Sequence, residues 1–163
     1  MRIIVDSREQ RPFTFKAPCY AGTVTLRGKL STGDYSLPML ESRIAIERKS
    51  MDDLAMCLGR ERSRFERELA RAAGLDAFAV VVEGSWIDLA HAKYRSKLNP
   101  HSACQSVLAF SARYGTSFIF ASTRNGAEYA TFGFLKQYLS GLKKSLVAIK
   151  AAEYVASEQG KGV

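Results

Sequence analysis

Residues 43–53 read Arg-Ile-Ala-Ile-Glu-Arg-Lys-Ser-Met-Asp-Asp and combine a strand pattern with a helix start. Successive side chains of a strand point to opposite faces. Ile44 and Ile46 therefore share one face, which we expect to pack against the core. Glu47 and Lys49 share the other face, at the end of the strand. This stretch predicts a strand whose charged end leads straight into a helix.

The same alternation of strands and helices extends over the whole chain. Ser50 is a typical N-cap, and the two acidic residues that follow Met51 lie in the first turn, where the helix dipole favours them. Strands that alternate with helices are typical of a layered α/β fold. The expected strands are 2–6, 23–30, 43–48, 77–83 and 117–121, and the expected helices are 51–58, 60–73, 85–92, 101–114 and 126–158, the last broken near Gly133 and Gly141.

Length and charge narrow the class of protein. The 163 residues suit one domain, which we place at residues 1–158, followed by a flexible tail at 159–163. The net charge is +8 and the isoelectric point is about 9.6. This excess favours a phosphate-rich partner, with DNA as the first candidate and a solvated basic surface as the alternative. Because we find no signal-peptide pattern and no long apolar run, we expect a cytoplasmic protein without a membrane span.

The strongest chemical signal is a set of acids around one lysine. The chain has three cysteines, none of them in a C-x-x-C pair, and two histidines, which argues against disulfide and zinc sites. Asp34 follows a glycine turn and is expected to converge on Glu47 from a neighbouring strand. Two carboxylates beside Lys49 suit Mg²⁺, which would polarise a phosphodiester and lower the pKa of an attacking water. A surface ion-pair cluster is the alternative interpretation.

Two motifs in the first third of the chain resemble those of the XPF/Mus81 (ERCC4-type) family of DNA nucleases. Gly33-Asp34, Glu47-Arg48-Lys49 and Asp53 fit the family pattern G-D-x(n)-E-R-K-x-x-x-D. The stretch Val5-Asp6-Ser7-Arg8-Glu9 is similar to the family's first-strand motif, V-D-x-R-E. The resemblance covers about residues 2–140. It implies a restriction-nuclease-like α/β fold, with a mixed central sheet flanked by helices on both faces.

The resemblance also implies an activity. Members of the family cleave a phosphodiester near duplex–single-strand junctions in a metal-dependent reaction that leaves 5′-phosphate and 3′-hydroxyl ends. We therefore expect a Mg²⁺-dependent DNA endonuclease that acts on branched or flap-like DNA, with Mn²⁺ able to replace Mg²⁺. By the same resemblance, Lys49 is the catalytic lysine. The implied metal ligands are Asp6, Asp34 and Glu47, and the implied supporting residues are Arg8, Arg48 and Asp53.

The strand pattern does not place Arg48 with the other motif residues of the site. Alternation sends its side chain to the face opposite Glu47 and Lys49. We expect it either to brace the site from that face or to pair with Asp53 near the start of the following helix.

A stripe of arginines on the helix expected at 60–73 is the second basic feature. Four arginines recur there at spacings of four, three and four residues and so share one side of the helix. They are expected to contact DNA phosphates beside the site, although a solvated face paired with glutamates would have the same spacing. In the basic loop that follows residue 92, Lys97 is a further candidate DNA contact. The arginines are Arg60, Arg64, Arg67 and Arg71.

The C-terminal helical region has more apolar residues than one narrow stripe holds. These residues are expected to pack on the sheet or to build a dimer face. Members of the family often pair through this region, so the resemblance implies a homodimer formed by the C-terminal helices.

The motifs favour an enzyme but leave its mode of action open. The alternative function is a non-catalytic DNA-binding partner with the same fold, and such proteins typically lose the acids that this chain keeps. An exonuclease or a resolvase on the same fold is a further alternative. Cellular members usually append a tandem helix-hairpin-helix module, which is not evident here. A stand-alone nuclease of this kind is more typical of a bacterial or bacteriophage protein.

Overall fold

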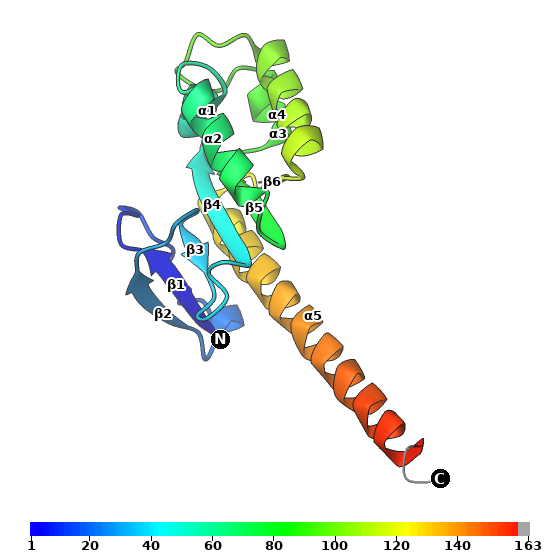
Figure 1. The fold of residues 1–163 in the computed structure, drawn as a ribbon. Helices are drawn as coiled ribbons and strands as arrows, with labels where there is room; N and C mark the ends of the chain where they lie inside the picture. The colour runs from blue at the N-terminus through cyan, green and yellow to red at the C-terminus, as the bar shows by residue number, and fades with distance from the viewer. Residues whose placement is uncertain (160–163) are drawn as a thin grey trace.

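A computed structural model describes residues 1–159, with side chains described through residue 154. In this part of the chain, strands and helices alternate as the sequence predicts (Figure 1). The strands are β1 (Arg2–Asp6), β2 (Val24–Gly28), β3 (Tyr35–Ser36), β4 (Ile44–Ser50), β5 (Ala77–Glu83) and β6 (Ser117–Phe120). The helices are the 3₁₀ turn η1 (Pro18–Tyr20), α1 (Met51–Leu58), α2 (Arg62–Ala72), α3 (Trp86–Ala90), α4 (Pro100–Tyr114) and α5 (Arg124–Gln159).

The described strands form one mixed sheet in the order β2-β1-β3-β4-β5-β6. β1 and β2 are parallel, and β4, β5 and β6 are parallel. β3 is antiparallel to both β1 and β4 and joins the two parallel groups. The predicted mixed sheet is therefore confirmed. β3 escapes prediction because two residues are too few to display a period of two.

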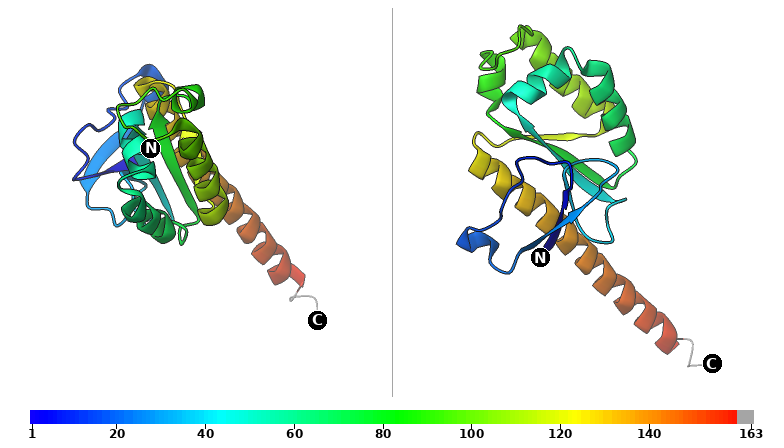
Figure 2. Two further views of the ribbon diagram at one scale, coloured as in Figure 1. Left: turned by 90° about the horizontal axis from the view of Figure 1, so that it is seen from above. Right: turned by 90° about the vertical axis from the view of Figure 1, so that its left-hand side faces the viewer.

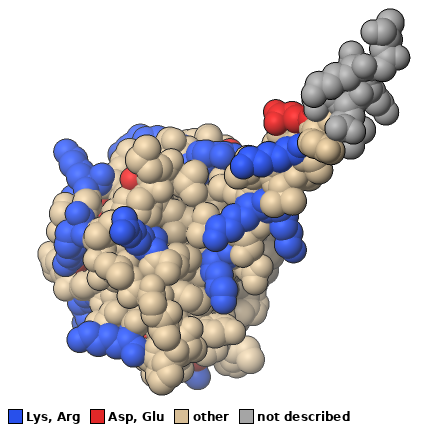
Figure 3. All heavy atoms as spheres, turned by 90° about the horizontal axis from the view of Figure 1, so that it is seen from below, with Lys and Arg blue, Asp and Glu red and all other residues tan. Residues whose placement is uncertain are grey.

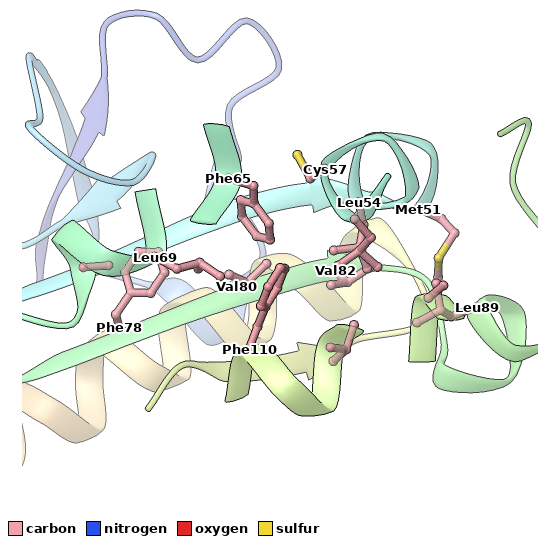
Figure 4. Close-up of a cluster of buried hydrophobic side chains, with 14 of the residues drawn as sticks. Met51, Leu54, Cys57, Phe65, Leu69, Phe78, Val80, Val82, Leu89 and Phe110 are labelled. Atoms are coloured by element: carbon pink, nitrogen blue, oxygen red, sulfur yellow. The ribbon is translucent and has the colours of Figure 1, made fainter. Parts of the chain in front are cut away.

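Each face of the sheet has its own hydrophobic core. On one face, α1 to α4 pack on β4, β5 and β6, and Phe65 of α2 meets Val80 of β5 and Phe110 of α4 (Figure 4). On the other face, α5 and the segment before β2 cover the sheet, and Leu135 belongs to the same cluster as Ile46 of β4. Helices thus flank the sheet on both faces, as predicted. β4 lies between the two cores, which holds it rigidly.

α5 runs unbroken from Arg124 to Gln159, so the predicted breaks near Gly133 and Gly141 are wrong. A glycine inside a helix costs only about 1 kcal/mol. Burial of a leucine side chain contributes about 1.5–3 kcal/mol, and Leu135 is fully buried. The outer half of the helix projects away from the sheet (Figure 2). We call this part, from residue 142 onward, the α5 arm.

Other boundaries differ little from those predicted. Ser50 is both the last residue of β4 and the N-cap of α1, and its hydroxyl accepts a hydrogen bond from the Asp53 N–H at 3.2 Å. α2 begins at Arg62, so Arg60 lies in the preceding turn instead of on the helix. The predicted tail lies outside the described residues except for residue 159, which ends α5. Along residues 1–159, no helix combines the length and the apolar composition that a membrane crossing requires.

Candidate active site

β4 presents two of the predicted catalytic side chains on one face of the sheet. Ile46 is fully buried on the α5 side, whereas Glu47 and Lys49 lie on the opposite face, next to α2. The Lys49 ammonium is 5.7 Å from the centre of the Phe65 ring of α2. The alternation predicted for this strand is therefore confirmed.

A glycine turn brings Asp34 next to Glu47. Gly33 has a φ of +77°, and a Cβ atom there would lie 2.9 Å from the carbonyl oxygen of Ile46. Glycine alone fits this position without strain. The pairing of Tyr35 with Ile46 then carries Asp34 to the same cavity as Glu47. The convergence of the two acids expected from the sequence is confirmed.

Three hydrogen bonds fix Asp34 between β1 and β4. Its N–H donates to the Ile46 carbonyl at 2.7 Å, and its carbonyl accepts from the Asp6 N–H at 2.8 Å. Its carboxylate Oδ2 accepts the backbone N–H of Arg48 at 2.8 Å. The Asp34 carboxylate thus takes the place that a neighbouring strand would have as the partner of this β4 amide. Asp34 is held by both strands that carry the other predicted ligands.

Two adjoining cavities bring together the predicted catalytic residues other than Arg48. The acid cavity has a volume of about 380 Å³, and the lysine cavity, beside it under α1 and α2, has about 220 Å³. Both are lined by Arg64 and Glu68 of α2, which form their shared wall. The predicted residues in the acid cavity are Asp6, Arg8, Asp34 and Glu47, and those in the lysine cavity are Lys49 and Asp53.

Asp6 is the most heavily hydrogen-bonded of the predicted ligands. Its carboxylate accepts the backbone N–H groups of Arg8 at 2.8 Å and Leu30 at 2.7 Å, and Nε and Nη2 of Arg8 at 2.7 and 3.0 Å. Hydrogen bonding from Arg8 lowers the pKa of Asp6 to about 2. A carboxylate has about four acceptor sites, so these donors occupy Asp6 and hold Arg8 in a fixed orientation.

Burial makes the charged forms of Asp34 and Glu47 costly. It raises the pKa of Asp34 to about 6, and it raises the pKa of Glu47 well above its usual value. An ion pair with the Lys49 ammonium offsets part of this cost at Glu47. Two crowded carboxylates in one cavity, of which Glu47 is buried and Asp34 is partly buried, are typical of functional sites.

The donor set of Asp34 and Glu47 fits a magnesium ion. Proteins usually bind Mg²⁺ through one or two carboxylates, with water and phosphate oxygens as the remaining ligands. A cation between the two acids would also relieve the burial penalty that raises their pKa values. Within the described residues, no group of three or more His, Cys, Asp or Glu side chains is arranged to hold a metal. Asp6 lines the same cavity as the two acids, and its role as a third ligand stays a prediction.

Arg48 lies behind the site, on the α5 face of β4. Its guanidinium donates to Glu9 at 3.0 Å and to Glu83 of β5 at 2.9 Å. The predicted pairing with Asp53 is wrong, because Asp53 is exposed on the other side of the strand and accepts the Ser50 hydroxyl at 2.7 Å. The alternative prediction, that Arg48 braces the site from the opposite face, agrees with these contacts.

Among the predicted DNA contacts, Arg71 lines the acid cavity, and Arg64 lies on the wall that the acid and lysine cavities share. The Arg64 side chain is 74% exposed, forms an ion pair with Glu61 at 2.9 Å and lines both cavities. Arg60 is exposed in the turn before α2, near the lysine cavity but not in its wall. Arg67 and Lys97 are exposed and line neither cavity.

Sequence reasoning missed four charged residues around the site. Glu68 lines both cavities, and Glu9, Glu83 and Arg124 form a network with Arg48 behind β4. Glu9 ends the V-D-x-R-E motif and Glu83 ends a buried strand, so both carried a weak signal. No local pattern marks Arg124, which is 41 residues from its partner Glu83.

Comparison with known protein families agrees with this geometry. The sequence model of the ERCC4 domain matches residues 5–131, which is most of the chain and includes both cavities.

The chain belongs to the ERCC4 domain family.

Solved structures with the same fold include XPF from Aeropyrum pernix, alone and in complex with DNA. The first has 22% sequence identity and a TM-score of 0.67, and the match covers 85% of this chain and 61% of that one. The second also has 22% identity, with a TM-score of 0.63 and coverage of 86% and 66%. This chain thus spans less than two thirds of the length of those it matches. No curated protein sequence matches it.

The ERCC4 domain match ends at Thr131, inside α5. All seven residues predicted to form the catalytic site therefore lie within the family domain, whereas the α5 arm lies beyond it. The arm is a feature of this chain that the family match does not cover.

We expect the metal-free Asp34→Asn variant to be more stable than the wild type at neutral pH. The pKa of Asp34 is about 6 in the folded protein, against a usual value of 3.8. Ionisation therefore opposes folding, and the free energy of unfolding falls as the pH rises from about 4 to about 6. A shift of two pKa units corresponds to roughly 3 kcal/mol in the free energy of unfolding. The gain in stability of Asp34→Asn should be smaller than this, because asparagine loses a charge-assisted hydrogen bond. Chemical denaturation in EDTA at about pH 4 and pH 7 measures the difference.

Asp76→Asn is the matched control with the opposite sign. Tyr138 and Arg43 lower the pKa of Asp76, so its ionised form stabilises the fold and this variant should be less stable at neutral pH. An Asp34→Asn protein that loses stability at pH 7, as Asp76→Asn does, would contradict the burial penalty at Asp34.

Proposed function

We propose that this protein is a Mg²⁺-dependent DNA endonuclease that hydrolyses phosphodiester bonds in branched or flap-like DNA, with Mn²⁺ able to replace Mg²⁺. The observation that carries the proposal is the convergence of Asp34 and Glu47 on one cavity, with Lys49 on the same face of β4. Membership of the ERCC4 domain family supports it, as does the likeness to an XPF structure in complex with DNA.

Each side chain has a distinct task in the proposed reaction. Asp34 and Glu47 would hold Mg²⁺, which would polarise the phosphodiester and lower the pKa of the attacking water. Lys49 would stabilise the negative charge that grows in the transition state. Arg8, whose side chain is 65% exposed although Asp6 fixes its orientation, would contact the phosphate from the other side of the acid cavity. Asp6 thus acts through Arg8 in this proposal.

Electrostatics supports DNA as the partner. The net charge is +8, and on the face drawn in Figure 3 Lys and Arg side chains clearly predominate over Asp and Glu. Such a field attracts a polyanion from several directions. Next to the acids themselves, Arg64 is an exposed cation on the shared wall of both cavities. Phosphates that contact Arg64 would lie within reach of the proposed metal site.

Cleavage assays test the proposal directly. We expect labelled flap, fork and splayed-arm DNAs to be cut with Mg²⁺ or Mn²⁺ and left intact in EDTA. Under single-turnover conditions with saturating enzyme, Lys49→Ala should lower the cleavage rate by about 10²–10³, the usual cost of removing one group that stabilises charge in the transition state.

Two purified variants complete the assay. Asp34→Asn is the control for contaminating nuclease and should cut nothing, while Lys97→Ala removes an exposed lysine outside both cavities and should keep the wild-type rate at saturation. A wild-type protein that binds DNA but leaves every substrate intact would instead indicate the non-catalytic alternative. Products from circular single-stranded DNA distinguish an endonuclease from an exonuclease.

The salt dependence of binding tests Arg64. The logarithm of the DNA affinity should fall linearly with the logarithm of the salt concentration, by about 0.9 per duplex phosphate contacted. Arg64→Ala should reduce that slope by about one contact. Arg113→Ala is the matched control, because Arg113 is also an exposed arginine near a glutamate, but it lies on α4 away from both cavities. Equal slopes for wild type and Arg64→Ala would show that Arg64 does not contact a DNA phosphate.

We also propose that two copies of the chain pair along the α5 arm. Leucine and isoleucine recur at residues 135, 139, 142, 146 and 149, with the alternating spacing of four and three that characterises coiled coils. The inner members pack on the sheet, but Leu146 is 52% and Ile149 is 55% exposed. Pairing would cover this apolar stripe, which a single copy leaves open to water.

Sedimentation measures the pairing. The wild type should sediment as a dimer at about 100 μM, and Leu146→Glu should shift it to monomer because a charge enters the seam. Ala148 lies two residues further on, about 200° around the helix, so Ala148→Glu is the matched control and should leave the dimer intact. A wild type that stays monomeric at this concentration would refute the pairing.

A further inference from the structure

A closed network of charged groups lies behind the acid and lysine cavities, on the α5 face of the sheet. Arg48 of β4 donates to Glu9 at 3.0 and 3.3 Å and to Glu83 of β5 at 2.9 Å. Glu83 also accepts from Nη1 of Arg124, the first residue of α5, at 2.7 Å. The Arg48 side chain is only 10% exposed and that of Glu83 only 14%. Two arginines and two glutamates thus balance their charges in a largely buried place.

Arg124 closes this network onto the segment that follows β1. Its Nη2 donates to the carbonyl oxygens of Arg11 at 2.7 Å and Pro12 at 3.0 Å. Its guanidinium lies 5.0 Å from the centre of the Phe13 ring. Glu9, at the start of the same segment, accepts the Arg11 N–H at 2.6 Å. One side chain of α5 therefore ties together β5 and the loop that carries Glu9.

The network meets the site at two points. The peptide that joins Glu47 to Arg48 supplies the N–H that holds the Asp34 carboxylate at 2.8 Å, so the anchoring of the Arg48 side chain fixes this amide. Glu9 directly follows Arg8, whose guanidinium pairs with Asp6 at the wall of the acid cavity. A shift of either glutamate would thus move the Arg48 amide or Arg8, and with them the groups that line the acid cavity on the opposite face of the sheet.

We propose that Arg124 is a positioning residue of the active site, acting through Glu83 on Arg48 and through the loop on Arg8. The inference rests on the proposed nuclease function for its effect on rate, but not for its effect on the position of β4. Without Arg124, a single guanidinium would serve both Glu9 and Glu83, and the loop carbonyls would lose their donor. A buried charge that loses one partner relaxes toward water or toward another partner. Either movement displaces Arg48.

Cleavage kinetics of Arg124→Gln test the effect on rate. Under single-turnover conditions with saturating enzyme, we expect the rate to fall about tenfold, while the DNA affinity stays within about twofold of the wild type. Arg124→Lys keeps the charge and should recover part of the loss. The matched control is Arg43→Gln, which removes an arginine–aspartate ion pair next to the opposite end of β4, and it should cut at the wild-type rate. Wild-type cleavage by Arg124→Gln would overturn the inference.

Hydrogen exchange separates this inference from the nuclease proposal. Exchange of the Arg48 amide, measured by NMR without DNA or metal, should be at least about fivefold faster in Arg124→Gln than in wild type or Arg43→Gln. Unchanged exchange at this amide would overturn the positioning role, whatever the protein cuts. A wild type that cuts nothing, combined with faster exchange in Arg124→Gln, would refute the nuclease function and support the positioning role. Arg124→Lys provides the same reading should the glutamine variant be too unstable to measure.

Discussion

The hydrogen bond from the backbone N–H of Arg48 to the carboxylate of Asp34 is the contact on which the proposed site depends. β3 pairs with β4 only opposite Ile46, and beyond that point a side chain takes over the role of the missing strand. β4 itself continues beside β5 as far as Ser50. Because the Asp34 carboxylate is bound to the peptide that directly follows Glu47, the two acids cannot move independently of each other. The geometry of the two carboxylates is therefore built into the sheet, where positions are held more precisely than in loops.

The two faces of β4 divide the work of building this site. Toward α2 the strand presents Glu47 and Lys49, which line the two cavities. Toward α5 it presents Ile46 to the core and Arg48 to two glutamates. Charges on both faces of an interior strand are costly unless each is paired. The pairing of Arg48 behind the sheet lets the strand keep two functional charged groups in front of it.

Local patterns predicted the parts of the site that depend on neighbouring residues. The alternation of side chains along a strand placed Glu47 and Lys49 on one face, and Ser50, as a typical N-cap, predicted the helix that follows. The partners of Arg48 were not predictable in this way, because Glu9, Glu83 and Arg124 reach it from distant segments. α5 was expected to break at its glycines because helix propensity depends only on local sequence, whereas the burial of Leu135 that stabilises the helix depends on the sheet against which it packs. Family motifs supplied Asp6 and Arg8, whose mutual pairing only the structure reveals.

The central claim is that Asp34 and Glu47 form one cation site in the acid cavity. The most direct measurement is anomalous diffraction from crystals of the wild-type protein grown with Mn²⁺. We predict an anomalous peak in the acid cavity, at coordination distance from a carboxylate oxygen of both residues, as for a hard cation bound by oxygen ligands. A saturated crystal with no peak in this cavity, or with one that contacts neither carboxylate, would contradict the claim.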